Sequence, residues 1–362
     1  MRKSKICIVT VYDNNNFGNR LQNYAMQRIL SSRGFEVLTL KHRIKTDKPS
    51  GILTGLCIHI LKNIQEFIRN IKIIKRYSKF KQFNKHIKFY TRYMIYNRYK
   101  SLNSKFDYFV VGSDQIWNLN TYESKMYVNF LDFVIDNNKK IAIAPSIALD
   151  SLTNFQYELL SNSLTNFKSL SCREEQGANI IRHCTKRECQ TIIDPTLMLS
   201  KEHWLTLICK PKFHNENIKY ILLYFLGGIK NEIYKYIINV ANKYNLCIVN
   251  LLDKKSKYYN CGPSEFLYLI NNSSMVFTDS YHATIFSYIF GKPLKIVKRV
   301  EKTSKESMYS RLENLIKHLN LNCCELSFDN ISSKDFNINY DYNCLKDEQK
   351  KFNDYLNKAF TN

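Results

Sequence analysis

The residues best suited to chemistry lie in the segment 278–293, TDSYHATIFSYIFGKP. An apolar run that ends at Thr278 is followed by Asp279 and Ser280, residue types that cap helix starts, and then by a helical pattern. His282 is therefore expected at the start of a helix, where free N–H groups attract anions and an imidazole can transfer protons. The alternative is a histidine that only caps or packs.

Polar side chains also follow several other apolar runs of the chain. In open α/β sheets, ligands lie outside the carboxyl ends of the strands. A single polar residue there is most often a turn former or cap, and Arg173 beside Glu174 could form a plain ion pair. An arginine, an aspartate and a histidine at equivalent places predict a shared site. The candidates besides 279–282 are Asn16, Gly18, Asn19, Asp114, Arg173 and Glu174.

Short apolar runs alternate with helical patterns, which predicts an α/β fold with parallel sheets. The first such unit lies at 5–40, and a second set begins near Tyr220. Two successive halves of this kind favour two Rossmann-like domains that face a cleft. We expect a first domain at 1–200 with a basic helical insertion at 56–102, a second at 201–330, and a segment at 331–362 whose helix packs back on the first domain.

The composition indicates a globular protein of two domains, with 362 residues and 44% hydrophobic content. Neither a targeting segment nor a membrane span is expected. The 11 cysteines are dispersed without a CxxC pair, which predicts free thiols in a reducing cytosol and no metal site. We therefore expect a cytoplasmic protein.

The formal net charge of +23 is concentrated in one segment. Between Ile58 and Lys100 the chain has twelve Lys and Arg residues against one acidic residue, Glu66. An apolar helical pattern accompanies the charge, as in a cationic amphipathic helix on the anionic inner face of the cell membrane. A solvated basic face, an oligomer contact and codon bias toward lysine are the alternatives.

Six blocks of sequence together resemble the polysaccharide pyruvyl transferase family along nearly the whole chain. In order, they are NFGNRLQNYAMQRIL, VVGSDQIWN, KIAIAPS, SCREEQGANII, IIDPTLMLSKEHW and TDSYHATIFSYIFGKP. The resemblance implies a two-domain fold of the glycosyltransferase-B type. It also implies transfer of the pyruvyl group of phosphoenolpyruvate onto two hydroxyls of a sugar as a ketal, with release of phosphate. Phosphoenolpyruvate would be a co-substrate, and no further cofactor is expected.

The resemblance also assigns roles to individual residues. His282 matches the motif histidine and would be the general acid or a phosphate contact, and Arg173 matches the strand-end arginine and would hold the donor. Asp114 would orient or deprotonate the acceptor hydroxyl. The acceptor would be a glycan, polymeric or lipid-linked, bound on the first domain by Asn16, Gly18, Asn19, Gln115 and Trp117.

One position departs from the family pattern. Many members carry Arg-x-His where this chain has Ser280-Tyr281-His282, so another cation must replace that arginine. We expect Arg311 to do so. The donor-binding set is therefore Arg173, Ser280, Thr284, Lys292, Lys298 and Arg311, with Arg299 as a further cation nearby.

Two other functions are compatible with the sequence. A glycosyltransferase that uses a nucleotide sugar could have the same fold. A nucleic-acid binder would explain the charge and the aromatic residues interspersed in YSKFKQFNKHIKFYTRY. The chain lacks a recognised nucleic-acid motif, so we expect no nucleic-acid partner.

Overall fold

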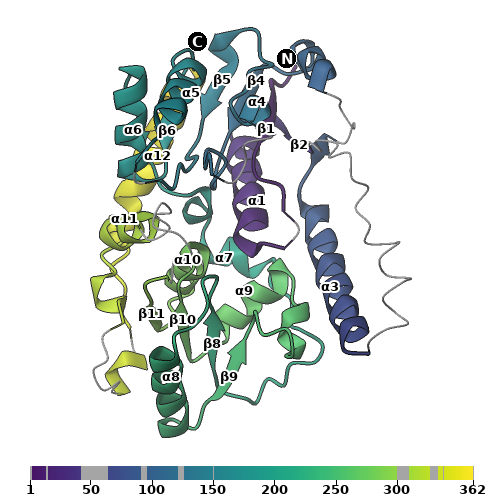
Figure 1. Cartoon of the computed structure of the whole chain (residues 1–362), viewed down its shortest axis with the longest axis vertical. Coiled ribbons are helices and arrows are strands. Elements are labelled where there is room, and N and C mark those ends of the chain that lie inside the picture. Colours follow the sequence, from purple (N-terminus) through teal and green to yellow (C-terminus); the bar gives the residue numbers. More distant parts are fainter. Residues whose placement is uncertain are drawn as a thin grey trace.

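The computed structural model describes residues 2–13, 15–41, 64–90, 96–120, 126–149, 151–299, 310–326, 333–336 and 338–361. Two separate parallel sheets form its frame, one above the other in Figure 1, with helices beside both. The predicted α/β class with two Rossmann-like halves is therefore confirmed.

The first sheet has five parallel strands with β1 at its centre, where Ile6 pairs with Val37 on one side and Tyr108 on the other. The strand sequence KICIV is almost continuously apolar because helices cover both faces of such a sheet. In spatial order the strands are β3 (Phe89–Tyr90), β2 (Glu36–Leu40), β1 (Lys5–Val9), β4 (Tyr108–Val111) and β5 (Lys140–Ala142).

The helices and the short strand pair of this half follow the same chain order. They are α1 (Phe17–Ser32), α3 (Ile64–Phe83), α4 (Met126–Asn129), α5 (Asn154–Leu164), β6 (Ser171–Cys172), α6 (Glu175–Thr185), β7 (Gln190–Thr191) and α7 (Lys201–Leu205). Asn16 caps α1 by accepting a hydrogen bond from the Asn19 N–H at 3.3 Å.

The second sheet has four parallel strands in the order β11 (Leu294–Ile296), β10 (Met275–Thr278), β8 (Tyr220–Tyr224) and β9 (Cys247–Asn250). Its helices are α8 (Asn231–Lys243), α9 (Pro263–Asn271) and α10 (Tyr281–Ile289), followed by α11 (Ser310–His318). Pro263 begins α9 at a position where its missing N–H costs nothing. The helix α10 is buried along its whole length because it lies between the two halves.

The two halves are joined by one apolar core at α1. No open cleft separates the described residues of the two halves there. Side chains from β1, α1, β8, α9 and α10 belong to a single buried cluster. Phe17 of α1 stacks on Phe266 of α9 with ring centroids 4.6 Å apart and on Phe80 of α3 at 5.4 Å. The predicted cleft is thus filled by apolar side chains at this place.

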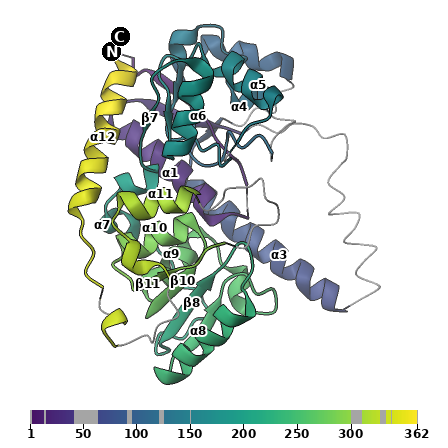
Figure 2. The ribbon, with the colours of Figure 1, turned by 60° about the vertical axis from the view of Figure 1, so that its left-hand side comes forward.

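The helix α12 (Asn343–Phe360) returns from the second half to the first. Figure 2 shows it running along the molecule past α7 and α1. The Tyr355 hydroxyl donates to the Ala142 carbonyl of β5, and Phe360 packs against Phe35, with ring centroids 4.8 Å apart. Earlier, Tyr340 and Tyr342 donate to backbone carbonyls at the end of α10, so the segment is attached to both halves.

The described part of the basic segment forms an α-helix, a short strand and two 3-10 helices, whereas the expected insertion at 56–102 was helical. After α3 the chain joins the edge of the first sheet as β3, and a 3-10 helix covers Tyr96–Ser104. Residues 56–63 and 91–95 of the predicted insertion lie outside the described residues. Helix α3 packs against the second half, where Lys79 pairs with Glu265 at 2.6 Å.

Arg76 on α3 is a buried structural residue. Its guanidinium lies 4.4 Å from the centre of the Phe17 ring and donates to the Tyr259 carbonyl at 3.0 Å. Other residues of α3 remain at the surface, with Ile73, Ile74 and Tyr77 exposed to 43–48%. Only part of the basic segment is therefore available to a partner.

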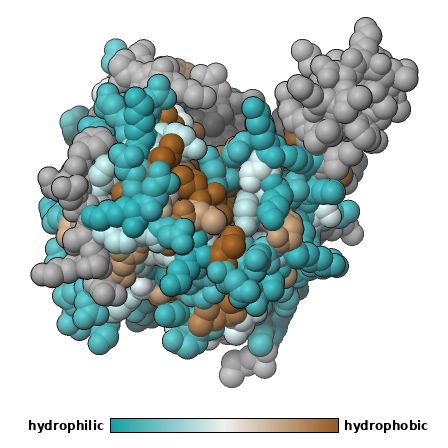
Figure 3. Space-filling model, turned by 90° about the horizontal axis from the view of Figure 1, so that it is seen from below, coloured by the Kyte–Doolittle hydropathy of each residue, from teal (hydrophilic) through white to brown (hydrophobic). Residues whose placement is uncertain are grey.

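The lower end of the molecule carries mainly hydrophilic atoms around a limited apolar area (Figure 3). Large exposed apolar residues are few among the described residues and include Tyr234 on α8 and Leu226 after β8. Among those residues, no helix combines the length and the hydropathy needed to cross a bilayer.

Candidate functional site

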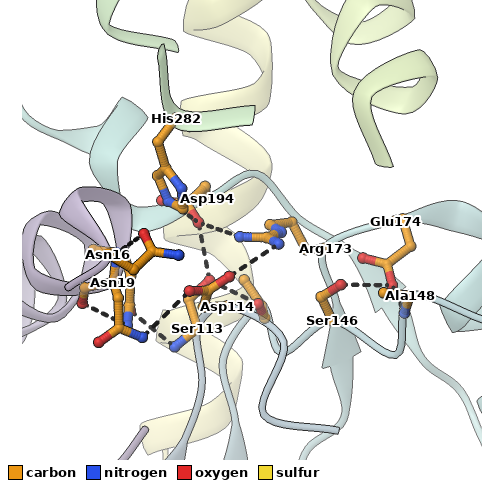
Figure 4. A network of polar contacts seen from close by, with 12 residues as sticks. Asn16, Asn19, Ser113, Asp114, Ser146, Ala148, Arg173, Glu174, Asp194 and His282 are labelled. Carbon is orange, nitrogen blue, oxygen red and sulfur yellow. Dashed lines mark hydrogen bonds and ion pairs between the residues drawn. The ribbon is translucent and has the colours of Figure 1, made fainter. Parts of the chain in front are cut away.

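Four ionisable side chains from four separate segments meet where the two halves adjoin (Figure 4). Asp114 follows β4, Arg173 follows β6, Asp194 follows β7, and His282 lies in the first turn of α10. All four are at most 8% exposed. The prediction that strand ends bring Asp114, Arg173 and His282 together is confirmed.

Asp194 is the centre of this cluster. Its Oδ2 accepts from Arg173 Nη1 at 2.9 Å and from Ser113 Oγ at 3.1 Å, and lies 3.6 Å from His282 Nε2. Its Oδ1 accepts from the N–H and hydroxyl of Thr196 at 2.9 and 2.7 Å. Burial alone would raise the pKa of Asp194, but the proximity of His282 and Arg173 holds it well below its usual range.

Arg173 is held between two carboxylates and an aromatic ring. Besides Asp194, its Nη2 lies 3.5 Å from Asp114 Oδ1, and its guanidinium carbon lies 4.2 Å from the centre of the Tyr281 ring. Burial alone would raise the pKa of Asp114, but Arg173, His282 and Arg311 outweigh it and lower that pKa. Asp114 is therefore an ionised acceptor of hydrogen bonds and a weak base.

His282 is placed by the start of α10 and by a glycine in α1. Ser280 caps α10 by accepting from the Ala283 N–H at 3.5 Å. A Cβ added to Gly18 would lie only 2.0 Å from His282 Nδ1, so the imidazole occupies the space that any other residue at position 18 would fill. Neither His282 Nε2 nor Thr284 Oγ1 has a hydrogen-bond partner within the described part of the chain, although both are buried.

Arg311 on α11 is the additional cation that the structure brings to the site. It is 5% exposed, and the Gln115 amide oxygen, with the amide oriented toward it, accepts from both terminal nitrogens at 2.5 Å. Burial, Arg173 and Arg299 lower the pKa of Arg311 to about 9. An anion bound here would offset that burial and repulsion.

Arg299 is held by a carboxylate of the second half. Its Nε donates to Asp279 Oδ2 at 3.2 Å, and Asp279 also accepts from the N–H groups of Leu226 and Gly227 at 2.7 and 2.8 Å. Asp279 thus joins the end of β10 to the loop after β8 and fixes the approach to α10.

The first turn of α1 adds a polar edge to the cluster. Asn19 donates to Asp114 Oδ2 at 3.4 Å, and its own amide oxygen accepts from Arg20 Nε at 3.1 Å. Arg20 Nη2 also donates to the Val11 carbonyl at 2.8 Å. Burial lowers the pKa of Arg20 to about 10, although Tyr12, Asp13 and Asp114 act in the opposite direction.

A sequence model of the polysaccharide pyruvyl transferase family matches residues 16–294. This range spans most of the chain and every residue of the cluster except Arg311 and Arg299. The chain belongs to the polysaccharide pyruvyl transferase family. It is therefore a member of a transferase family for polysaccharide pyruvylation, whereas no curated protein sequence matches it.

Among solved structures, a UDP-GlcNAc 2-epimerase from Neisseria meningitidis aligns over 98% of this chain and 100% of its own, with 14% identity and a TM-score of 0.47. The Arabidopsis thaliana protein UGT89C1, complexed with UDP-L-rhamnose, aligns over 99% and 94%, with 10% identity and a TM-score of 0.44. TM-scores and identities this low give no information about the substrate. The substrate has to be inferred from the residues of this chain.

Several predicted site residues lie elsewhere in this pyruvyl transferase family member. Trp117, predicted to bind the acceptor, is fully buried in the first half and donates through its indole N–H to the Asn129 carbonyl at 3.1 Å. Lys292 follows the opposite end of α10 from His282, and Lys298 is exposed beyond β11. Neither is part of the buried cluster.

Glu174 does not form the predicted alternative ion pair with Arg173. Its Oε1 accepts from Ser146 Oγ and from the N–H groups of Ile147 and Ala148 at 2.8–3.1 Å. The pairing of Arg173 with Asp114 and Asp194 explains why it extends away from its sequence neighbour.

Sequence reasoning missed Asp194, Arg20 and Tyr281 as members of the site. The signal for Asp194 was present, because IIDPT places an aspartate after an apolar run, as for Asp114. Because Asp-Pro is also common in turns, the sequence around Asp194 predicts a turn. Its partners could not be predicted, since they come from distant segments.

Proposed function

We propose that this chain transfers the pyruvyl group of phosphoenolpyruvate onto two hydroxyls of a sugar in a polymeric or lipid-linked glycan. The observation that carries the proposal is the convergence of Arg173, Arg311 and His282 on one buried place at the start of α10. A donor with a carboxylate and a phosphate needs several cations and helix N–H groups. Arg311 takes the place of the arginine that Ser280 replaces.

The reaction balances with the groups present. The first sugar hydroxyl attacks the central carbon of phosphoenolpyruvate while the methylene carbon accepts a proton and becomes a methyl group. The bond to phosphate then breaks, and the second hydroxyl completes the ketal. One hydroxyl proton replaces the proton delivered to carbon, and the other leaves with phosphate.

His282 is the proton donor in this proposal, because its Nε2 is buried beside the cluster without a hydrogen-bond partner in the described ranges. Arg173 and Arg311 bind the donor's anionic groups, and Thr284 Oγ1, two residues after His282 on α10, is a further polar group. Asp114 orients the acceptor hydroxyl; its lowered pKa makes it poorly suited to removing a proton.

Phosphate release from phosphoenolpyruvate tests this function. The purified protein is incubated with a panel of lipid-linked and polymeric glycans, and the product is examined by mass spectrometry for the mass of a pyruvyl ketal. Acceptor-dependent phosphate release is expected. Thermal stabilisation by nucleotide sugars, with none by phosphoenolpyruvate, would instead identify a nucleotide-sugar glycosyltransferase.

We also propose that the exposed face of α3 rests on an anionic membrane surface, which would bring the site to a lipid-linked acceptor. Ile73, Ile74 and Tyr77 are exposed there next to Lys75, a combination of apolar anchors and positive charge.

Flotation with anionic and with neutral vesicles tests this surface. The double variant Ile74→Ser with Lys75→Glu is expected to lose binding to anionic vesicles. Tyr234→Ser with Lys235→Glu alters an equivalent exposed pair on α8 and serves as the matched control. Absence of wild-type binding to anionic vesicles would refute the proposal. Arg76 is unsuitable for such a test because it is buried.

A further inference from the structure

Asp194 joins the two groups to which the proposed function gives chemical roles. Arg173 Nη1 donates to its Oδ2 at 2.9 Å, and the same oxygen lies 3.6 Å from His282 Nε2. No other described residue forms an ion pair with His282. Arg173 comes from the first half and His282 from the second, so one carboxylate oxygen sets the distance between them.

The position of Asp194 is itself fixed independently of these two groups. Its Oδ1 caps the 3-10 helix Pro195–Met198 by accepting from the Thr196 N–H at 2.9 Å, and also accepts the Thr196 hydroxyl at 2.7 Å. Ser113 Oγ approaches Oδ2 to 3.1 Å. Asp194 has no exposed surface, so its carboxylate has a single defined orientation.

The carboxylate also decides which nitrogen of His282 carries hydrogen. An ionised carboxylate only accepts hydrogen bonds, and the surrounding charges keep Asp194 ionised. An Nε2 lone pair directed at Oδ2 across 3.6 Å would be repelled, whereas an Nε2–H is attracted. The same carboxylate cannot donate a proton to the ring.

We propose that Asp194 is a positioning residue that fixes a hydrogen on His282 Nε2 and sets this group beside Arg173. The inference rests on the proposed function for its catalytic consequence, since the ring that delivers the proton to the methylene carbon is then held in one orientation beside Arg173. Its structural part, the state of the imidazole, does not depend on the substrate.

The variant Asp194→Asn separates the negative charge from the shape of the side chain. Its amide oxygen can still cap Thr196, and its NH2 group then faces Arg173 and His282. We expect kcat for phosphate release to fall roughly 100-fold, a loss of the size caused by removing the hydrogen-bond partners that orient metal-binding histidines. KM for phosphoenolpyruvate should change much less.

Asp136→Asn is the matched control. Asp136 also caps a 3-10 helix, by accepting from the Asn138 N–H at 2.9 Å, but it is exposed and remote from the cluster. Wild-type kcat is expected for this variant. The comparison requires a wild type that releases phosphate in the assay. If Asp194→Asn then folds and retains the wild-type kcat and KM, the proposal is overturned.

Nitrogen NMR of histidine-labelled protein provides a readout without substrate. The His282 signal is assigned by its loss in His282→Gln. At mildly alkaline pH the wild type should show a protonated Nε2, and Asp194→Asn should move the hydrogen to Nδ1. A wild-type ring with hydrogen on Nδ1 would overturn the proposal even if Asp194→Asn does not fold. If the NMR shows hydrogen on Nε2 but the protein releases no phosphate, the proposed function is refuted and the inference about Asp194 is not.

Discussion

The first half of the molecule contributes Asp114, Arg173 and Asp194, whose charged groups contact one another, whereas the second half contributes His282 and Thr284. His282 Nε2 and Thr284 Oγ1 are buried without a hydrogen-bond partner among the described residues. Buried polar atoms are normally hydrogen-bonded, and exceptions mark functional places. The first half thus forms an ionic frame in which Arg173 Nε and Nη2 also lack a hydrogen-bond partner within the described ranges, and the second half adds the imidazole and the hydroxyl.

The largest expected effect is on the second half. His282→Ala should lower the rate of phosphate release by roughly 10²- to 10⁴-fold, because it removes the proton donor and leaves the frame in place. His183→Ala, at an exposed position on α6, is the control and should keep the wild-type rate. Equal rates for wild type and His282→Ala would remove this histidine from the mechanism.

The contribution of the ionic frame to stability can be tested by lowering the pH. The lowered pKa values of Asp114 and Asp194 mean that their contribution to stability is fully present above the unfolded-state pKa, near 4, and is lost as pH falls toward the folded-state values. Urea unfolding from neutral pH to pH about 3 should show this loss. Asp194→Asn should be less stable at neutral pH by about 3 kcal/mol and less sensitive to acid.

The contact between the halves can be broken at Gly18. Gly18→Ala should cost about 1–3 kcal/mol, because its Cβ collides with the His282 ring. In a His282→Ala background the same change should cost less, by at least about 0.5 kcal/mol. Unfolding of the two single variants and the double variant measures this coupling, and additive effects would contradict the contact.

Arg311 provides a smaller effect, on donor binding. Arg311→Gln removes a buried positive charge, so the apparent Kd for phosphoenolpyruvate, measured by thermal shift, should rise roughly tenfold or more. An Arg311→Gln variant that binds phosphoenolpyruvate as tightly as the wild type would exclude Arg311 as a donor contact.

The smallest effect is expected at Lys292, which lies beyond the far end of α10. Lys292→Ala should change KM for phosphoenolpyruvate by less than about twofold, as for most substitutions away from a site. A large rise in KM would place the donor at the opposite end of the helix from His282.

The sequence was sufficient to predict the elements that carry the site, because their signals are local. The start of α10 was evident from Ser280, and the ends of β4 and β6 from apolar runs. Lys292 could have been excluded by helix length alone, since about 1.5 Å per residue separates it from His282 by roughly 15 Å.

Burial and distant pairing were not predictable in this way. Trp117 was assigned to the acceptor and Arg76 belongs to the basic segment, yet both are buried. Trp117 packs on Phe167, and Arg76 donates to the Tyr259 carbonyl. Asp194 has the sequence of a turn, and its partners come from β4, β6 and α10. These contacts depend on how two sheets are placed, which local patterns do not encode.

The return of α12 to the first sheet has a consequence for biosynthesis. The ribosome makes β1 to β5 long before the residues that bind Ala142 and Phe35 emerge. Until then, the apolar surface that Leu356 and Tyr355 later cover remains in contact with water. The core of the first half is therefore completed only when the last helix of the chain has been made.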